Sequence, residues 1–467
     1  MIAKKSLNYK LLFIFLTFLV FTRFYNLQNT TRFIWDESSD LVKIHQYFIE
    51  KKITLVGPVS EDGNKVFSSL TYYLLMPFTI LRNFDPLSPA IGSAFFGVIT
   101  GLLFFLLLKK INPKLPAYYY LILILFWFPL IETSRWAWNP NFIPFWTVLA
   151  LLVYQKQTNW SFFLTGLILG LTIHHHYLAL FSIGAFSLVV FIQTFKKKQL
   201  INFFLYGFGI FLTILPFVLF DLRHPPGLFL TRILFFNQAE IKFDFLYLVN
   251  KFIENIKQIL FYFTQSKILS FILGGLTASL LVMDIKAKSR SLNYALPWLF
   301  QILALSFIVN VYNHYFLPSL IFFIVWLLYP REKNAFLVVK TSLVVLTLGA
   351  VFSINHQLTN KNWQTDIPSV RAITNLIVKT IDTEDLKNNN LAVLVSPDNN
   401  IYGRRFRDLL LIKNINLNTK EEYQISDHLF VISTGDENQI RNDPAIEVSN
   451  FRNGSLEGKW KSQILPG

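Results

Sequence analysis

The chain has 467 residues, of which 53% are hydrophobic, 17% aromatic and only 15% charged, and its formal net charge is +15. A composition this apolar excludes an ordinary soluble globular protein and indicates a membrane protein. The chain has no cysteine, which excludes disulfides, thiolate metal sites and cysteine nucleophiles. Any chemistry must therefore use carboxylates, histidines or hydroxyl groups.

The positive charge is concentrated before residue 351. That part has 30 Lys and Arg against 14 Asp and Glu, whereas the remainder has 13 against 14. The basic residues form short clusters between apolar segments, which is typical of cytoplasmic loops beside anionic lipid. We therefore expect membrane lipids, and no nucleic acid, among the partners.

The first apolar segment follows Lys4, Lys5 and Lys10 and continues to about Leu27. It is long enough to cross a hydrocarbon core of ~30 Å at ~1.5 Å per residue, and no small-residue cleavage site follows it. We expect an uncleaved first span whose N-terminus is cytoplasmic.

Ten more apolar segments bring the predicted total to about eleven spans. They cover roughly residues 88–108, 115–131, 140–154, 160–175, 177–195, 200–220, 256–284, 292–310, 313–330 and 335–353. If the spans alternate from a cytoplasmic start, all five inner loops are basic, at 109–114, 155–159, 196–198, 286–290 and 331–333. This agreement requires residues 67–81, which are short for a span, to lie along the outer interface.

The same topology puts the reactive clusters outside. They are "FIWDESSD" (33–40), "ETSRWAWNPN" (132–141), "IHHHY" (173–177), "DLRHPPG" (221–227) and "YNHYF" (312–316). A transporter would more naturally keep its ionisable groups near the middle of the membrane, so this placement favours a site that opens to the exterior. A transporter or flippase of lipid-linked glycans, and a non-enzymatic scaffold, remain alternative classes.

The composition changes after about Asn355. A small α/β domain is predicted by strand-like segments at 390–397 and 427–434 and a helical pattern at 404–414. An odd number of spans after a cytoplasmic N-terminus places this domain outside. The predicted domains are a transmembrane domain at 1–354, with its first outer loop at 28–87, and an extracytoplasmic domain at 355–467.

The stretch "FIWDESSD" brings Asp36, Glu37 and Asp40 together beside the first span. In one interpretation, they only begin an interfacial helix, where acidic side chains suit the helix dipole. In the other, a carboxylate partly desolvated by Trp35 and neighbouring helices takes a proton from an acceptor hydroxyl or amine. The residues alone leave both interpretations open.

Several blocks carry a family resemblance. "TRFYNL", "WDESSD" and "SSLTYYLLMPF" follow one another as in the membrane glycosyltransferases of the GT-C class. More narrowly, the chain resembles glycosyltransferase family 39, which includes protein O-mannosyltransferases and the lipid A aminoarabinose transferase. The resemblance covers roughly the first 330 residues and includes "SRWAWNPN", "HHHYLAL", "DLRHPP" and "YNHYFLP".

The resemblance implies a polytopic α-helical membrane protein with the GT-C fold and interfacial helices in the first outer loop. It implies a hexosyl- or pentosyltransferase of the cell envelope that uses a polyprenyl-phosphate sugar donor without a nucleotide and inverts the anomeric carbon. The acceptor would be a glycan, a lipid or a protein. The expected location is a bacterial cell membrane, with the active site outside.

The acidic pair of the family corresponds to Asp36 and Glu37. Asp36 is expected to be the catalytic base and Glu37 to orient it or the sugar, with Glu37 as the alternative base. Asp40, one helical turn after Asp36, assists or only caps.

The leaving phosphate needs positive charge or hydrogen-bond donors. The candidates are Arg135, Arg223, His224 and His314, with Arg223 first because it adjoins a span and carries a planar fork of donors. Many relatives have a basic residue followed by proline where this chain has Ser68 and Ser69. Lys65 could substitute for that basic residue. No Arg or Lys lies within "FIWDESSD" itself. The alternatives are that Arg135 and Arg223 reach lipid headgroups and that His314 only accompanies Tyr312 at the interface.

The triplet His174, His175 and His176 raises the question of a metal. Adjacent helical residues point in different directions, so the triplet is poorly suited to a metal ion, and we expect one of these histidines to bind phosphate or sugar. No cofactor is predicted, and a divalent metal stays an alternative that no spacing indicates. Aromatic side chains could also line a sugar pocket, namely Trp136, Trp138, Tyr177 and Tyr312.

Overall fold

The computed structural model describes residues 9–59, 66–235, 244–359, 367–394, 401–433 and 437–451. It forms two compact units. The first, here called the helical unit, comprises Met1–Tyr25, Thr54–Thr71 and Ser93–Leu358. The second, here called the mixed unit, comprises Asn26–Ile53, Tyr72–Gly92 and Thr359–Gly467.

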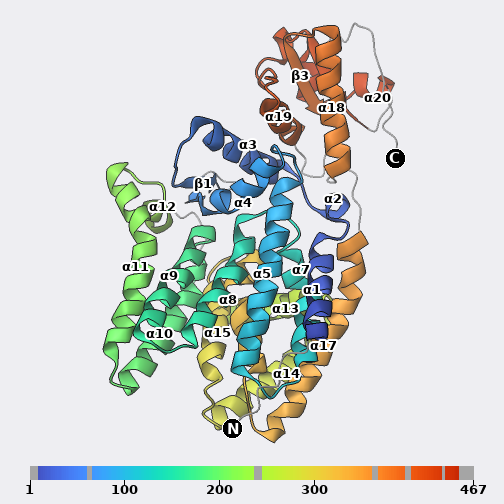
Figure 1. Ribbon diagram of the computed structural model, residues 1–467. Coiled ribbons are helices and arrows are strands. Elements are labelled where there is room, and N and C mark those ends of the chain that lie inside the picture. The colour runs from blue at the N-terminus through green and yellow to red at the C-terminus, as the bar shows by residue number, and fades with distance from the viewer. Residues whose placement is uncertain are drawn as a thin grey trace. The chain divides into compact units, whose positions relative to one another are not determined.

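The helices of the helical unit lie side by side as a bundle (Figure 1). They are α1 (Tyr9–Phe24), α5 (Ser88–Ile111), α6 (Ala117–Phe126), α7 (Phe128–Glu132), η1 (Asn139–Phe142), α8 (Ile143–Tyr154), α9 (Asn159–His175), α10 (Ala179–Lys196), α11 (Leu200–Arg223), α12 (Leu230–Phe235), α13 (Phe245–Thr264), α14 (Lys267–Lys286), α15 (Leu292–Leu305), η2 (Asn313–Phe316), α16 (Leu317–Leu328) and α17 (Lys333–Thr359). An antiparallel pair, β1 (Val56–Val59) and β2 (Val66–Ser68), belongs to the same unit.

Five helices of the described chain, α5, α10, α11, α14 and most of α17, are long and apolar enough to cross a membrane. The protein is therefore an integral multi-pass membrane protein. Two of the predicted spans are each divided between two α-helices. Residues 256–284 do not form one helix, because Gln265 adopts a left-handed conformation (φ 53°) and Ser266 caps a new helix, α14. Residues 115–131 are likewise divided at Trp127, where Pro129 suits the first turn of α7.

Helices α9 and α11 approach closely because glycines face the partner backbone. A side chain at Gly166 would collide with the Tyr206 carbonyl of α11, and one at Gly209 would collide with the backbone of α9. Small residues at a helix interface permit this distance between membrane helices. The close packing fixes the end of α9, where the histidine triplet lies.

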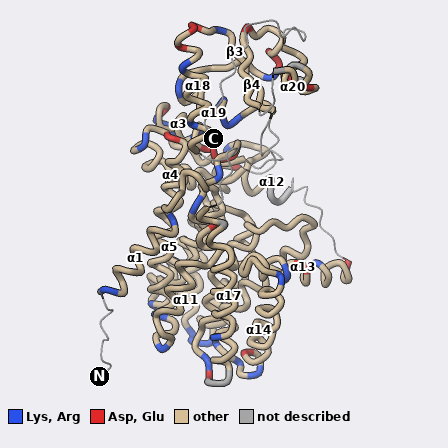
Figure 2. The backbone as a smooth tube through the Cα atoms, turned by 90° about the vertical axis from the view of Figure 1, so that its right-hand side faces the viewer, with Lys and Arg blue, Asp and Glu red and all other residues tan. Residues whose placement is uncertain are grey.

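Basic residues mark one end of the helical unit. Lysines occupy the last turns of α5, α10 and α14, and Figure 2 shows Lys and Arg gathered at the lower end of this bundle. Arg331, which follows α16, makes a bidentate ion pair with Asp284 of α14 at 2.8 Å for each bond. The C-terminal ends of α14 and α16 therefore lie together at this end of the helical unit.

The mixed unit joins the first loop to the C-terminal residues. Its elements are α2 (Leu27–Thr30), α3 (Trp35–Glu50), most of α4 (Leu70–Leu81), α18 (Ile367–Glu384), β3 (Asn389–Val393), α19 (Arg404–Ile412), η3 (Tyr423–Ile425), β4 (His428–Ile432), α20 (Glu437–Arg441) and α21 (Ile446–Ser449). Strands β3 and β4 pair in parallel from Asn389 opposite His428 to Val393 opposite Ile432. The elements β3, β4 and α19 lie where the sequence pattern predicts two strands and a helix.

Candidate functional site

The acidic stretch forms the first turn of α3, and Glu37 is fixed within it. Glu37 is only 3% exposed. Its Oε2 accepts a hydrogen bond from the backbone N–H of Ile34 at 2.9 Å, and its Oε1 accepts one from Nε of Arg32 at 3.0 Å. Reaching back to the residue before the helix is how a glutamate at this position closes a helix start. Both carboxylate oxygens of Glu37 thus stabilise the N-terminus of α3.

Asp36 has a more accessible carboxylate. Its side chain is 31% exposed, and the guanidinium of Arg32 lies 3.9 Å from its Oδ2. Sequence reasoning missed Arg32, which stands just before the quoted stretch. Arg32 precedes α3, so helical spacing did not indicate it, and the available signal was its closeness to the acidic pair in the sequence. The positive charge absent from "FIWDESSD" is therefore supplied immediately upstream.

Asp40 lies in a less hydrated place than Asp36. Its Oδ1 accepts a hydrogen bond from the hydroxyl of Tyr72 in α4 at 2.8 Å. Burial raises the pKa of Asp40 to about 8, against the effect of the Tyr72 hydrogen bond, and the charges of Asp36 and Glu37 raise it further. Asp40 is therefore mostly protonated at neutral pH, which makes it a poor general base and a neutral neighbour for Asp36.

The raised pKa of Asp40 predicts a pH-dependent stability. Between the ordinary pKa of 3.8 and about 8, the folded protein holds a proton that the unfolded chain releases. The contribution of Asp40 to stability is therefore present at low pH and is lost as pH rises through this window. Asp40→Asn imitates the protonated form, so its melting temperature in detergent should fall less than that of the wild type between pH 5 and pH 9. Parallel pH profiles for the two proteins would contradict this assignment.

The first turn of α3 also contacts α19, which belongs to the C-terminal part of the chain. The hydroxyls of Ser38 and Ser39 donate to Oδ2 of Asp408 at 2.7 and 3.1 Å. Burial raises the pKa of Asp408, whereas the hydrogen bond from Ser38 and the charge of Arg404 lower it. The guanidinium of Arg404 lies 5.9 Å from the ring centre of Trp35. No local pattern in the sequence indicated these contacts.

In the helical unit, several predicted residues form one aromatic cluster around His314. Its ring centre lies 4.4 Å from that of Trp138, 5.2 Å from that of His176 and 5.9 Å from that of Tyr312. Trp136 stacks on Trp138, with 4.9 Å between the ring centres. Tyr312 is exposed, with 57% of its surface accessible. Stacked aromatic rings with imidazole hydrogen-bonding groups suit a sugar or a phosphate.

The three histidines point in different directions, as the helical geometry predicts. Nδ1 of His174 contacts Oγ of Ser68 at 2.9 Å, and its Nε2 contacts the Thr213 carbonyl at 2.8 Å. Because a carbonyl only accepts, Nε2 of His174 carries the proton. His174 therefore links β2 to α11. Of the triplet, His176 is the member within the His314 cluster.

His175 is fully buried between three hydrogen-bonding groups. Its Nε2 accepts from the indole N–H of Trp146 at 2.8 Å, so its Nδ1 donates to Oγ1 of Thr71 at 3.0 Å. Its carbonyl accepts from the Asn139 side chain at 2.7 Å. His175 thus joins several elements of the helical unit and does not face water. Tyr177 is also buried, and its hydroxyl donates to the Val66 carbonyl while its ring stacks on Phe67 at 5.2 Å.

Arg135 binds the end of α1. Its guanidinium donates to the carbonyls of Thr22, Arg23 and Tyr25 at 2.9–3.2 Å. Arg23 makes the reciprocal arrangement, donating to the last carbonyls of α6. Burial lowers the pKa of Arg135 to about 10, and the partial negative charge of a helix C-terminus compensates such a cation. These bonds occupy both terminal nitrogens of Arg135.

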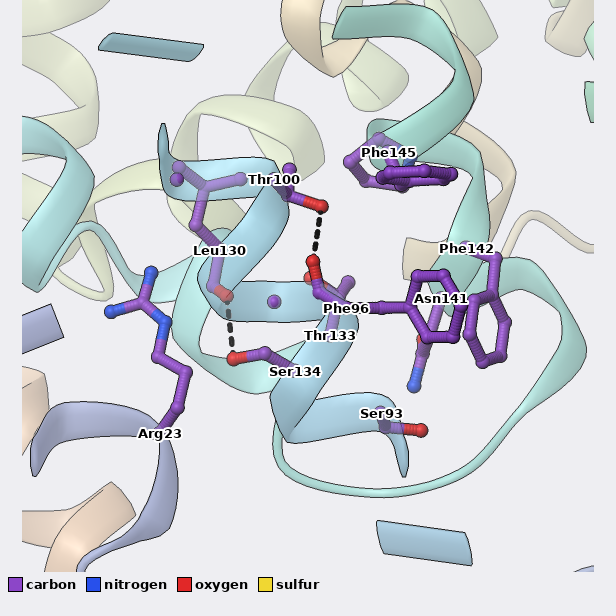
Figure 3. Close-up of a pocket in the computed structure, with 13 residues that line it drawn as sticks. Arg23, Ser93, Phe96, Thr100, Leu130, Thr133, Ser134, Asn141, Phe142 and Phe145 are labelled. Atoms are coloured by element: carbon purple, nitrogen blue, oxygen red, sulfur yellow. Dashed lines mark hydrogen bonds between the residues drawn. The ribbon is translucent and has the colours of Figure 1, made fainter. Parts of the chain in front are cut away.

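A small cavity is lined in part by Arg23 (Figure 3). It has a volume of about 10 Å³, which is room for roughly one water molecule. Two hydroxyl groups on its wall donate to nearby carbonyls, since Thr100 donates to Phe96 and Ser134 donates to Leu130 and Ile131. None of the predicted site residues lines this cavity.

Arg223 is the last residue of α11 and His224 begins the turn that follows it, and both are exposed. Asp221 shapes this turn by accepting backbone N–H groups from Leu228, Phe229 and Thr231 at 2.8–2.9 Å. Both basic side chains are thereby held outside the helix packing. Lys65 lies outside the described residues. Within the described ranges, no group of three or more His, Asp or Glu side chains could hold a metal ion.

Neither a protein-family model nor a curated protein matches this sequence. Two similar solved structures are crystal structures of ArnT from Cupriavidus metallidurans. The structure bound to undecaprenyl phosphate gives a TM-score of 0.56 at 11% identity and covers 92% of this chain and 87% of that chain. The apo structure gives a TM-score of 0.56 at 10% identity, with coverages of 94% and 92%. The chain therefore has the GT-C fold of these ArnT structures.

Proposed function

We propose that this protein transfers a sugar from a polyprenyl-phosphate donor to an acceptor on the outer side of the membrane. The observation that carries the proposal is the first turn of α3, where Asp36 is accessible while Glu37 is buried and doubly hydrogen-bonded. The shared fold supports it, since ArnT was crystallised with undecaprenyl phosphate. The sugar is a hexose or pentose, and the acceptor is a glycan, a lipid or a protein.

In the proposed reaction, an acceptor oxygen or nitrogen attacks the anomeric carbon and the bond from that carbon to the phosphate oxygen breaks. Asp36 takes the acceptor's proton, and polyprenyl phosphate leaves with the bonding electrons. Attack from the face opposite the phosphate inverts the anomeric carbon. Glu37 and Arg32 keep the turn in place, which preserves the direction of the Asp36 carboxylate.

For the leaving phosphate, Arg223 remains the first candidate, with His224 beside it. Both side chains are exposed where α11 passes into the turn that Asp221 shapes, so they can meet a charged group from the solvent side. Arg135 is a weaker candidate, because its guanidinium already serves the end of α1. Lys65 stays a candidate from sequence alone.

For the sugar, the His314 cluster is the candidate platform. Trp138, His176 and Tyr312 surround His314 within ring-centre distances of 4.4–5.9 Å. Aromatic faces stack on the apolar faces of sugar rings, while imidazole nitrogens can bind hydroxyls. His175 and Tyr177 support this region from within the core.

The proposed arrangement keeps about eleven spans, a cytoplasmic N-terminus, and an extracytoplasmic location for the site and for residues 355–467, in a bacterial cell membrane. The basic end of the helical unit supports this orientation, because Lys and Arg favour the cytoplasmic side (Figure 2).

The direct test uses purified protein in liposomes with a radiolabelled sugar on polyprenyl phosphate and a mixture of envelope acceptors. We expect the label to move to an acceptor and free polyprenyl phosphate to accumulate, whereas nucleotide sugars should give no product. Movement of the intact donor across the bilayer without any transfer of label would contradict the proposal and favour a flippase.

A further inference from the structure

The contact between α3 and α19 joins residues about 370 positions apart within the mixed unit. Asp408 is a carboxylate whose side chain is only 15% exposed. Burying a carboxylate is unfavourable unless hydrogen bonds or a cation compensate it. Here the two serine hydroxyls of α3 supply hydrogen bonds, and Nε of Arg404 lies 4.0 Å from the same oxygen.

The serines that Asp408 binds belong to the turn that carries Asp36. Ser38 and Ser39 follow the acidic pair directly. The carboxylate of Asp408 therefore binds α3 within one helical turn of Asp36, the proposed base. A carboxylate can only accept, which makes both serines donors in this contact. Arg404 adds a second contact one residue before Asp36, at the ring of Trp35.

Three separate attachments therefore fix this turn. Glu37 joins it to the entering chain, Asp40 joins it to Tyr72 of α4, and Asp408 joins it to α19. The first two are short-range or lie within the first outer loop. The contact of Asp408 comes from the C-terminal part of the chain. It binds α3 at the two residues that follow the acidic pair.

We propose that Asp408 is a positioning residue for the transfer reaction, holding α3 through Ser38 and Ser39 so that Asp36 keeps its catalytic orientation. This inference rests on the proposed function. It gives the C-terminal residues a part in catalysis, and it gives the two serines of the acidic stretch a role as the docking point for α19.

The test compares Asp408→Ala with Asp408→Asn in the full-length protein. The alanine variant loses the acceptor, and a misplacement of about 1 Å at a catalytic group can cost up to about 100-fold in rate. We expect kcat to fall at least 10-fold while KM for the donor changes little. The asparagine side chain keeps an oxygen that can accept both hydroxyls, so Asp408→Asn should retain most of kcat. Unchanged kcat in Asp408→Ala, or equal losses in both variants, would overturn the proposal.

Two further variants separate positioning from a general loss of charge or folding. Ser38→Ala/Ser39→Ala should lower kcat like Asp408→Ala, and the triple variant should be no worse than either, because all three changes break the same contact. Additive losses would overturn the shared contact. Asp382→Ala removes an exposed carboxylate of α18 and is the matched control, which should leave kcat unchanged.

Hydrogen exchange supplies a measurement that does not depend on activity. Amides of residues 35–40 should exchange at least 10-fold faster in Asp408→Ala than in the wild type, while those of α18 stay unchanged. Equal exchange in the two proteins would contradict the hold on α3. A wild-type protein without any transfer activity would instead contradict the proposed function, with the exchange result still deciding whether Asp408 holds the helix.

Discussion

Replacing Asp36 with Asn should lower kcat for sugar transfer by roughly 10²- to 10⁴-fold, the usual contribution of a positioned general base. Asparagine has nearly the same shape but cannot take the proton of the attacking acceptor. Because the side chain is 31% exposed, the substitution should leave α3 and the fold in place. The measurement is the initial rate of label transfer in liposomes, with donor binding measured separately to show that binding survives.

Two companion variants make this result specific. Glu37→Gln keeps an oxygen for the Ile34 N–H but weakens the contact with Arg32, so we expect a smaller loss in kcat together with lower stability. Glu50→Gln changes an exposed carboxylate at the other end of α3 and should have no effect on rate. If Asp36→Asn keeps full activity while Glu37→Gln loses it, the base is Glu37.

Short-range patterns predicted several elements of the fold and the local placement of some candidate residues. The acidic first turn of α3, the diverging histidines and the elements β3, α19 and β4 all follow from spacing within a few residues. The break at Gln265 was missed because the apolar pattern continues across it. What ends α13 is a left-handed backbone conformation followed by a serine cap, and neither interrupts hydropathy.

Contacts between distant segments account for what the sequence could not predict. Arg135 was expected near an outer helix end, but its binding to the carbonyls of α1 depends on how two segments more than 100 residues apart pack. The hydrogen bond from Ser38 to Asp408 joins residues 370 positions apart. In each case the residue type suggested a polar partner. Only the tertiary structure identified that partner, because a side-chain donor or acceptor can pair with many different groups.

The buried ion pair at the basic end of the helical unit gives the other large expected effect. Arg331 and Asp284 are 5% and 3% exposed, and the indole N–H of Trp326 also donates to Asp284 at 2.8 Å. Asp284→Ala leaves a buried guanidinium and a buried indole N–H without their acceptor. Removing one partner of a buried pair typically costs about 3–5 kcal/mol, so we expect a much lower melting temperature in detergent.

The remaining hydrogen bonds of Arg331 explain why its side chain should not move to reach water in Asp284→Ala. Its guanidinium also donates to the carbonyls of Trp326, Leu327 and Tyr329 at 2.7–3.1 Å, which ties it to the end of α16 and prevents it from turning toward water. The double variant Asp284→Leu/Arg331→Met removes both charges and should be more stable than Asp284→Ala, because no uncompensated ion stays buried. If Asp284→Ala melts like the wild type, the pair is solvated and does not hold α14 to α16.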